Sequence, residues 1–514
     1  MAPAGKIRQA ILGVSGIALF SKIFGFMREM VIAERFGTSH EYDVLLIAIT
    51  VPIFFNLVVA NATIFLAVPF LSRQMTGNGG DRGWRSFWEI GNSLCIIVAL
   101  IVVGIVLAAP VLVRVVGPNL AGAELTDGIF YCRAIAAVVF LTFLESYFRS
   151  ALNVKKEFVY PAAGTIILNI IAIAAIYLFS GKISVMAIIL GLLAGAFCQA
   201  LFQFARLTGF GVIEDFHLRF WGRDTKSLYA VGAMIIIVEF LSRTYFMIDR
   251  YFAGGLQIGV VSALNYSSLL VMLPVNVAGM AIAAVAFPYL SDRAADSKSG
   301  GISDLLGSTI HLSLVVGVPC GLFYLVFAQE LTAAVFLRGA FNLESLEMTS
   351  RILIFLVPHL ISLFLYSIFI QACYASGRQK FILGIAVAAI IIKILLTGLL
   401  KNLLGYIGIA LATSIVEVLI LIMISVVLIR DGNMSGMSRY GITILKIAAA
   451  SVPMIPVAMF IRTMPDFGPG LSLLSKFRVV PAFFISLAGF IAIGYLVKIE
   501  EVRRMVNKVR GAMV

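Results

Sequence analysis

The sequence predicts an all-α, polytopic membrane protein, and three features indicate this class: its composition, the length of its apolar segments and an internal repeat. Of the 514 residues, 61% are hydrophobic and only 13% are charged, and the mean hydropathy is +1.04. Soluble globular domains contain roughly 25% charged residues. The chain is therefore expected to cross a bilayer many times.

About fourteen apolar segments are long enough to cross a bilayer as helices. They cover residues 9–35, 43–72, 88–116, 128–151, 158–180, 183–205, 226–254, 260–290, 305–328, 349–376, 380–400, 404–429, 440–463 and 478–498. Turn-forming clusters such as Gly77-Asn78-Gly79-Gly80 separate neighbouring segments. The loops between them are too short to hold a soluble domain.

The first half of the chain recurs in the second half with an offset of 222 residues. This offset aligns Arg28, Gly37 and Pro52 with Arg250, Gly259 and Pro274. At an offset of 223, Ala151–Phe158 resembles Tyr374–Phe381. Each copy holds six helices, an even number, so both copies begin on the same side of the membrane as parallel repeats. The predicted domains are 1–212 with helices 1–6, 213–435 with helices 7–12, and 436–514 with helices 13–14.

Lys and Arg are sorted between alternate loops, as the positive-inside rule predicts for a membrane protein. Most loop cations, including those of both termini, fall on one side. The other loops contain only Lys182, Arg338, Lys401, Arg462, Lys476 and Arg478. Both termini are therefore expected in the cytoplasm. The net charge of +13 reflects this topology and an attraction to anionic lipid head groups, so no nucleic-acid partner is predicted.

The sequence contains no signature of catalytic or metal-binding chemistry. The five cysteines have neither metal-ligand nor disulfide spacing, and the four histidines form no cluster. A phosphate-binding Walker loop, an HExxH helix and a nucleophile elbow are all absent. We predict a transporter and not an enzyme, with no cofactor.

The first helix carries Lys22 and Arg28 deep in an apolar segment. Charge in hydrocarbon is costly, so such residues usually face a hydrated cavity. Arg suits a phosphate because its planar fork donates two parallel hydrogen bonds, and Lys acts as a point charge. We expect both residues to line a site for an anionic substrate, with a bend at Gly25 directing both toward one cavity. The alternative is that Arg28 only pairs with Glu29 or a neighbouring helix.

The seventh predicted helix carries Glu239, Arg243, Asp249 and Arg250. Glu239 and Arg243 are four residues apart, which permits an ion pair along the helix. This pair either serves function or only lowers the cost of burial. Asp249 is a candidate for binding a cation or for pairing across the interface between the repeats.

Two further charged positions lie at or inside predicted spans. Lys393 lies in the middle of a span and needs an acidic partner, for which Glu417 and Asp249 are available. Asp43 opens the second span, either as its N-cap or as part of the substrate site.

The chain resembles the MurJ (MviN) lipid II flippase family of the multidrug/oligosaccharidyl-lipid/polysaccharide exporter superfamily. The resemblance covers nearly the whole chain. It rests on Ser21-Lys22, Gly25-Phe26, Arg28-Glu29, Ala33, Phe36-Gly37, Asp43, Ala48, Pro52, Pro69-Phe70-Leu71-Ser72, Ala151-Leu152-Asn153, Phe158, Pro161-Ala162, Leu168-Asn169-Ile170, Pro274, Pro288, Leu290-Ser291 and Phe336-Leu337-Arg338-Gly339-Ala340-Phe341.

The resemblance implies a two-lobe carrier in the bacterial inner membrane that moves an undecaprenyl-diphosphate-linked glycan from the cytoplasmic to the periplasmic leaflet. Lys22, Arg28 and Asp43 match family site residues, and helices 13–14 would form a groove for the lipid tail. The family further implies coupling to the membrane potential, with sodium as a possible coupling cation. Some members of the family bind sodium among helices 7, 11 and 12, and Asp249 resembles the acidic residue of helix 7 at that site. We expect a monomer surrounded by membrane lipids.

Three positions depart from the family pattern: Asn56, Asn61 and Leu269 stand where relatives usually carry a basic, an acidic and a basic residue. Arg243 or Arg250 would replace the basic residue that is missing at Leu269. The Lys393 ammonium would stand where some relatives bind sodium.

Lipid II is the first candidate cargo, for peptidoglycan synthesis. A carrier of an exopolysaccharide or O-antigen precursor would share the same fold. A cation-coupled drug exporter would instead have an acidic cavity. A membrane-embedded glycan polymerase would need acidic residues on an outer loop, where Glu124 and Asp127 are the candidates.

Overall fold

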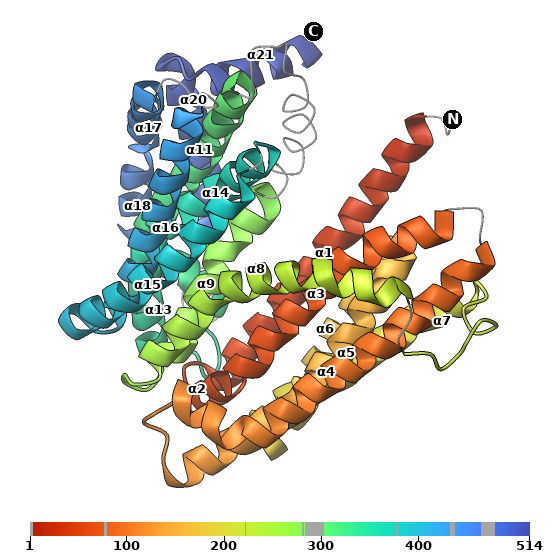
Figure 1. Ribbon diagram of the computed structural model, residues 1–514. Coiled ribbons are helices and arrows are strands. Elements are labelled where there is room, and N and C mark those ends of the chain that lie inside the picture. The colour runs from red at the N-terminus through yellow and green to blue at the C-terminus, as the bar shows by residue number, and fades with distance from the viewer. Residues whose placement is uncertain are drawn as a thin grey trace. The chain divides into compact units, whose positions relative to one another are not determined.

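The computed structural model describes residues 4–76, 80–220, 223–279, 282, 303–376, 378–431, 437–463 and 478–513. Within these ranges the regular structure is entirely helical (Figure 1). The predicted all-α fold class is therefore confirmed.

The chain divides into two compact units. Unit 1 comprises Met1–Ser262 together with Arg338–Phe341, and unit 2 comprises Ala263–Leu337 and Asn342–Val514. Unit 1 extends beyond residue 212, because the helix that follows packs against helices of the first repeat. The predicted boundaries after residues 212 and 435 refer to sequence repeats, and they stay predictions.

Unit 1 is built from eight helices and the first residues of a ninth. They are α1 (Ala4–Phe36), α2 (His40–Ala48), α3 (Thr50–Thr76), α4 (Gly80–Val116), α5 (Gly122–Val154), α6 (Val159–Ile183), α7 (Met186–Thr208) and α8 (Arg223–Ala253). α5 packs against α3, α4 and α7, α1 packs against α6, and α8 packs against α3 and α4.

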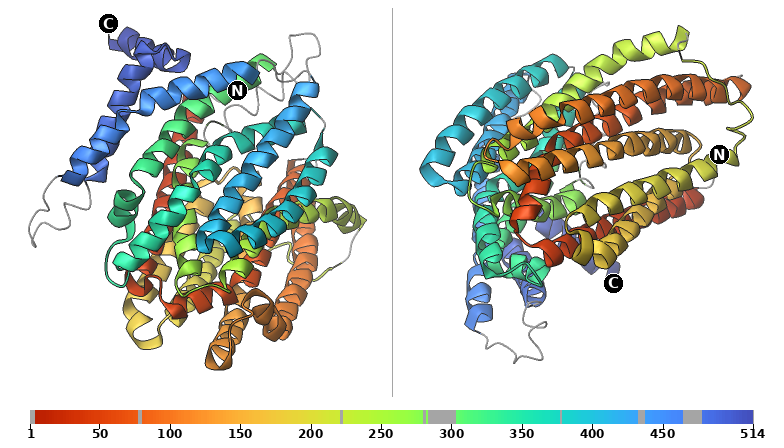
Figure 2. Two further views of the ribbon diagram at one scale, coloured as in Figure 1. Left: turned by 90° about the vertical axis from the view of Figure 1, so that its left-hand side faces the viewer. Right: turned by 90° about the horizontal axis from the view of Figure 1, so that it is seen from below.

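Unit 2 contains most of α9 (Val260–Pro274), the π-helix η1 (Val275–Gly279) and the remaining helices. These are α11 (Ser303–Val326), α12 (Ala328–Phe336), α13 (Leu343–Phe355), α14 (Val357–Ala375), α15 (Gln379–Leu404), α16 (Tyr406–Arg430), α17 (Met437–Ser451), α18 (Met454–Thr463), α20 (Val479–Leu496) and α21 (Glu500–Met513). Figure 2 shows the helices of each unit from two further directions.

The two units repeat a pattern of helix contacts. In unit 1, α7 contacts α6 and α5, and α5 contacts α4. In unit 2, α16 contacts α15 and α14, and α14 contacts α11. These pairs of helices have equivalent positions in the two predicted repeats.

Twelve helices in the described part of the chain are long and apolar enough to cross a membrane. They coincide with twelve of the predicted spans, and α1 and α8 cover the other two. The predicted end of the span 260–290, with its Pro288 and Leu290-Ser291 motif, lies outside the described residues.

Three predicted spans are each divided into two helices. The breaks fall at Ile49 between α2 and α3, at Leu356 between α13 and α14, and between α17 and α18. Each break lies within three residues of a proline: Pro52, Pro358 or Pro453. Proline lacks the amide hydrogen and clashes with the carbonyl four residues earlier, so it interrupts the helical ladder. The prediction of single uninterrupted spans was wrong at these places.

Candidate functional site

The predicted site residues of α1 lie on one unbroken helix of 33 residues. The helix continues through Gly25, whose Cα side faces the amide of Asn169 on α6. Six residues therefore turn Lys22 and Arg28 about 120° apart around the helix axis. The Lys22 side chain is exposed, whereas Arg28 is half-buried. The bend at Gly25 stays a prediction.

Arg28 forms an ion pair with its neighbour. Its Nε and Nη2 atoms donate to Oε1 of Glu29 at 3.2 and 2.6 Å. The side chains are 22% and 14% exposed. Two of the five N–H donors of the guanidinium are used in this way. The sequence alternative in which Arg28 pairs with Glu29 is therefore present in this structure.

Asp43 is buried and binds the beginning of α9. Its carboxylate accepts hydrogen bonds from the backbone N–H of Gly259 at 2.6 Å and of Ser262 at 2.8 Å, and from the Ser262 hydroxyl. A carboxylate at a helix N-terminus satisfies N–H groups that have no partner within the helix and interacts well with the helix dipole. Ser39, and not Asp43, is the N-cap of α2, through Tyr42 N–H. The prediction that Asp43 caps its own helix was wrong.

Arg250 lies near both the Arg28–Glu29 pair and Asp43. Its side chain is 6% exposed, and its guanidinium lies 4.7 Å from the centre of the Phe246 ring. It is within electrostatic range of Glu29, Asp43 and Asp249. We call Arg28, Glu29, Asp43, Asp249 and Arg250 the charge cluster. Two arginines and three carboxylates make it balanced to within one charge.

A second charged group joins α3 to α8. The Asn61 amide donates to Oε2 of Glu239 at 2.9 Å, and Arg243 Nε lies 3.6 Å from the same oxygen. Phe54 packs edge-on against Phe240 at 4.8 Å beside it. An amide suits this position, because it donates to Glu239, whereas a carboxylate would repel it.

The charges predicted for the first and seventh spans are therefore largely compensated. Unit 1 contains three arginines that have carboxylates as ion-pair or electrostatic neighbours. The arginines are Arg28, Arg243 and Arg250, and the carboxylates are those of Glu29, Glu239, Asp43 and Asp249. The expectation that Lys22 and Arg28 line a site for an anionic substrate stays a prediction. Buried arginines with carboxylate neighbours lower the cost of burial and remain able to exchange partners.

Unit 2 holds the other predicted charges. The Lys393 side chain is fully buried on α15, and its Nζ donates to the Thr413 hydroxyl on α16. Glu417 follows Thr413 by one helical turn and so lies on the same face of α16. The structure brings Lys393 and the Glu417-bearing face of α16 together in one unit.

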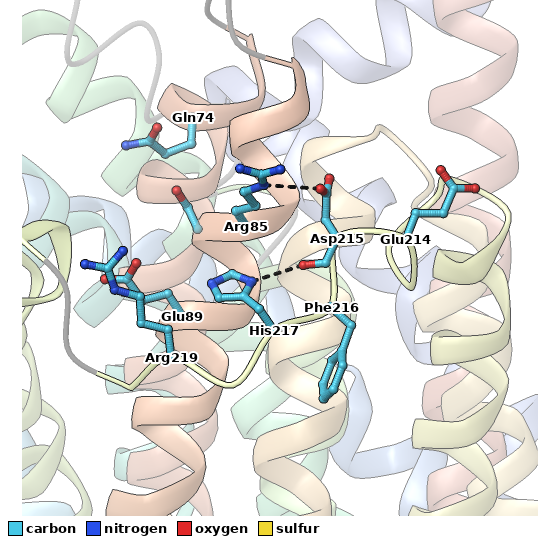
Figure 3. A pocket seen from close by; sticks show the side chains of 9 residues that line it. Gln74, Arg85, Glu89, Glu214, Asp215, Phe216, His217 and Arg219 are labelled. Atoms are coloured by element: carbon cyan, nitrogen blue, oxygen red, sulfur yellow. Dashed lines mark hydrogen bonds and ion pairs between the residues drawn. The ribbon is translucent and has the colours of Figure 1, made fainter.

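A polar pocket that the sequence interpretation missed lies in unit 1, at the start of α4 (Figure 3). Its volume is about 720 Å³. Arg85 Nε lies 3.4 Å from a carboxylate oxygen of Asp215, and the His217 ring bonds the Asp215 carbonyl at 3.0 Å. The segment after α7 that carries Asp215 and His217 is held to α4 by Trp88. A loop-to-helix contact over more than a hundred residues has no signal in hydropathy.

An all-α bundle of membrane spans with paired charges inside one unit defines a polytopic membrane transport protein. A family model described as "Lipid II flippase MurJ" matches residues 32–478. The chain therefore belongs to the lipid II flippase MurJ family.

Individual relatives agree with this assignment. The chain is 26% identical over 420 residues to the lipid II flippase MurJ of Burkholderia cenocepacia, which covers 79% of this chain and 81% of the relative. It is 25% identical over 518 residues to a probable lipid II flippase MurJ of Rhizobium tropici, which covers 97% and 96%.

Solved structures show the same fold. A lipid II flippase MurJ in an inward closed conformation matches with a TM-score of 0.78 at 21% identity, covering 96% of this chain and all of the other. An inward-facing multidrug resistance MATE family transporter of the MOP superfamily matches with a TM-score of 0.63 at 14% identity, covering 83% of this chain. The predicted family is confirmed, and the structural matches show that the fold is shared.

Proposed function

We propose that this protein is a flippase that moves an undecaprenyl-diphosphate-linked glycan, with lipid II as the first candidate, from the cytoplasmic to the periplasmic leaflet for peptidoglycan synthesis. The observation that carries the proposal is the family match over residues 32–478. Relatives named as lipid II flippases cover most of the chain. Alternating access would follow from a rocking movement of one lobe against the other.

The charge cluster suggests how a diphosphate is held. Arg28 directs two donors to Glu29, and its remaining donors are available to a phosphate oxygen. In the empty carrier, Glu29 lowers the cost of keeping Arg28 in the membrane. When the diphosphate binds, its negative charge would take over part of this role, so the guanidinium would always have an anionic neighbour.

Asp43 has a different role in this proposal. Its three hydrogen bonds tie α2 to the first turn of α9. A carboxylate with all these donors has little capacity to contact the substrate, and it would repel a diphosphate. We propose that Asp43 positions α9, and that Lys22, Arg28 and Arg250 or Arg243 provide the positive charge for the substrate.

Lys393 would replace a coupling cation. A fully buried ammonium that donates to a hydroxyl supplies a fixed positive charge in the membrane. Transport would then respond to membrane potential without a sodium requirement, and Asp249 would not act as a sodium ligand. Sodium-stimulated transport by the unmodified protein would contradict this part of the proposal.

The experiment that tests the function is a leaflet-accessibility assay for lipid II in cells that rely on this protein as their sole flippase. Lipid II should become accessible from the periplasmic side when the protein is produced. If lipid II stays inaccessible while an O-antigen or exopolysaccharide precursor is moved, the fold assignment holds and the cargo differs.

A further inference from the structure

The C-terminal helix α21 has a polarity unlike that of the spans before it. Its sequence places Arg503, Arg504, Lys508 and Arg510 in a stretch of fourteen residues, with Glu500 and Glu501 at its beginning. At 100° per residue, its apolar positions fall on one side and its cations on the two flanks of that side. This is the pattern of a helix that lies in the interface between lipid and water.

The connection to α20 fixes where α21 begins. α20 has 18 residues and a mean hydropathy of 2.2, which is enough to cross the hydrocarbon layer. It ends in a Schellman motif, in which Ile499 N–H bonds the Gly494 carbonyl at 2.9 Å and Lys498 adopts a φ of 62°. α21 begins directly afterwards at Glu500. Its first turn therefore lies at the membrane boundary.

The same turn fixes the direction of α21. Val502 is buried, and both Val502 and Ile499 lie close to Gly494 of α20, where a larger residue would crowd them. Arg503 donates to the Tyr495 carbonyl at 3.2 Å, and its guanidinium lies 5.4 Å from the centre of the Tyr495 ring. Figures 1 and 2 show that α21 runs across the end of α20 instead of continuing it. A helix that crosses the end of a membrane span runs along the membrane surface.

The polar side of α21 is directed to solvent. The side chains of Glu500 and Arg504 are 77% and 78% exposed, in contrast to Val502 on the opposite side. Arg504 also pairs with Glu500 at 3.5 Å, and Lys508 follows Arg504 by four residues in the sequence of the helix. Cations at this height are placed at the level of lipid phosphates.

We propose that α21 is an interfacial helix that binds the phosphate groups of anionic phospholipids in the leaflet where α20 ends. Val502 packs on α20, the apolar side of the helix faces the acyl boundary, and the cations of α21 supply the attraction to the head groups. The occupant is a bilayer lipid and not a soluble anion, because only a lipid matches both the apolar side and the cationic flank.

The test uses the full-length protein purified in detergent and titrated with phosphatidylglycerol or phosphatidylcholine, with bound lipid counted by native mass spectrometry. The unmodified protein should prefer phosphatidylglycerol. The variant R504Q/K508Q should bind phosphatidylglycerol about tenfold more weakly, since each basic residue near a membrane surface contributes to the attraction. The variant R504K/K508R should retain the preference.

A matched control removes two exposed cations at the ends of spans in unit 1, in the variant R114Q/K182Q. It should change phosphatidylglycerol binding much less than R504Q/K508Q does. Equal affinity of the unmodified protein for both lipids would overturn the proposal, as would equal effects of the two double variants. Displacement of the bound lipid by millimolar inorganic phosphate would show an unspecific anion site and would also overturn it. These readouts are independent of flippase activity.

Discussion

At the residue scale, the charged side chains inside unit 1 have two kinds of partner, a charged side chain or the backbone of another helix. Arg28 donates to the side chain of Glu29, whereas Asp43 uses its oxygens to hold the first turn of α9. Arg28 and Asp43 therefore differ in the kind of group that each one binds. Asp43 binds backbone N–H groups, which belong to the helix itself, whereas Arg28 binds a side-chain carboxylate.

Replacing Arg28 by Ala should abolish complementation of a flippase-depleted strain while membrane abundance stays normal. Arg28→Lys should retain part of the activity, because Lys keeps the charge but lacks the bidentate fork. The double variant R28A/E29Q distinguishes substrate binding from charge compensation. If Arg28 served only to neutralise Glu29, this double variant would grow normally, and unimpaired growth of either would refute the substrate role.

Asp43→Asn should lower the free energy of unfolding by about 1–3 kcal/mol, because an amide nitrogen would face backbone donors where the carboxylate accepts. The measurement is the thermal unfolding midpoint of the purified protein in detergent. Asp127→Asn, which changes an exposed acidic side chain of α5, is the matched control and should leave the midpoint unchanged. A midpoint equal to that of the control would show that the bonds at α9 contribute nothing to stability.

At the element scale, the tight turns decide where helices end and meet. Gly37 follows α1 with a φ of 53°, and a Cβ there would lie 2.3 Å from the Ala340 carbonyl oxygen. The Ala340 N–H in turn bonds the Glu34 carbonyl at 2.7 Å. The segment Arg338–Phe341 is thereby held against the end of α1 within unit 1. No local property of either segment predicts this contact.

Gly37→Ala should therefore destabilise the protein by at least about 1–2 kcal/mol, the cost of the left-handed conformation alone, with the clash added. Gly104→Ala is the control, because Gly104 lies in the middle of α4 with open space around its Cα. Ala there should be neutral or stabilising by about 0.5–1 kcal/mol. Unfolding midpoints of both variants in the same detergent provide the comparison. A Gly37→Ala midpoint at or above that of the unmodified protein would contradict the packing described for this turn.

At the scale of the whole molecule, the chain is a multi-pass membrane protein of the MurJ family, and its orientation in the membrane is open to direct measurement. The distribution of Lys and Arg predicts both termini in the cytoplasm. The same prediction places Lys182, at the end of α6, outside and Arg73, at the end of α3, inside.

In a cysteine-free background, Lys182→Cys should react with a membrane-impermeant thiol reagent added to intact cells, because its side chain is exposed at the end of α6 that the distribution of Lys and Arg predicts to lie in the periplasm. Arg73→Cys should react only after the membrane is made permeable. The reverse pattern would invert the orientation and with it the proposed direction of transport.

Much of this protein follows from its sequence. Hydropathy located the twelve helices of the described part of the chain that are long and apolar enough to cross a membrane, since the bilayer requires runs of apolar residues that are local and long. The repeat and the family were visible because matching residues keep their order along the chain. The breaks near Pro52, Pro358 and Pro453 could have been predicted from the prolines themselves, but a continuous apolar run concealed them.

The tertiary structure alone decided which charges meet. The sequence marked Arg28, Asp43, Arg250 and Lys393 as costly to bury, because that cost depends only on residue type and depth. It could not show that Asp43 binds α9, since its partners lie 216 and 219 residues away. Hydrogen bonds and ion pairs act over a few ångströms in space, and only folding brings such distant residues within that range.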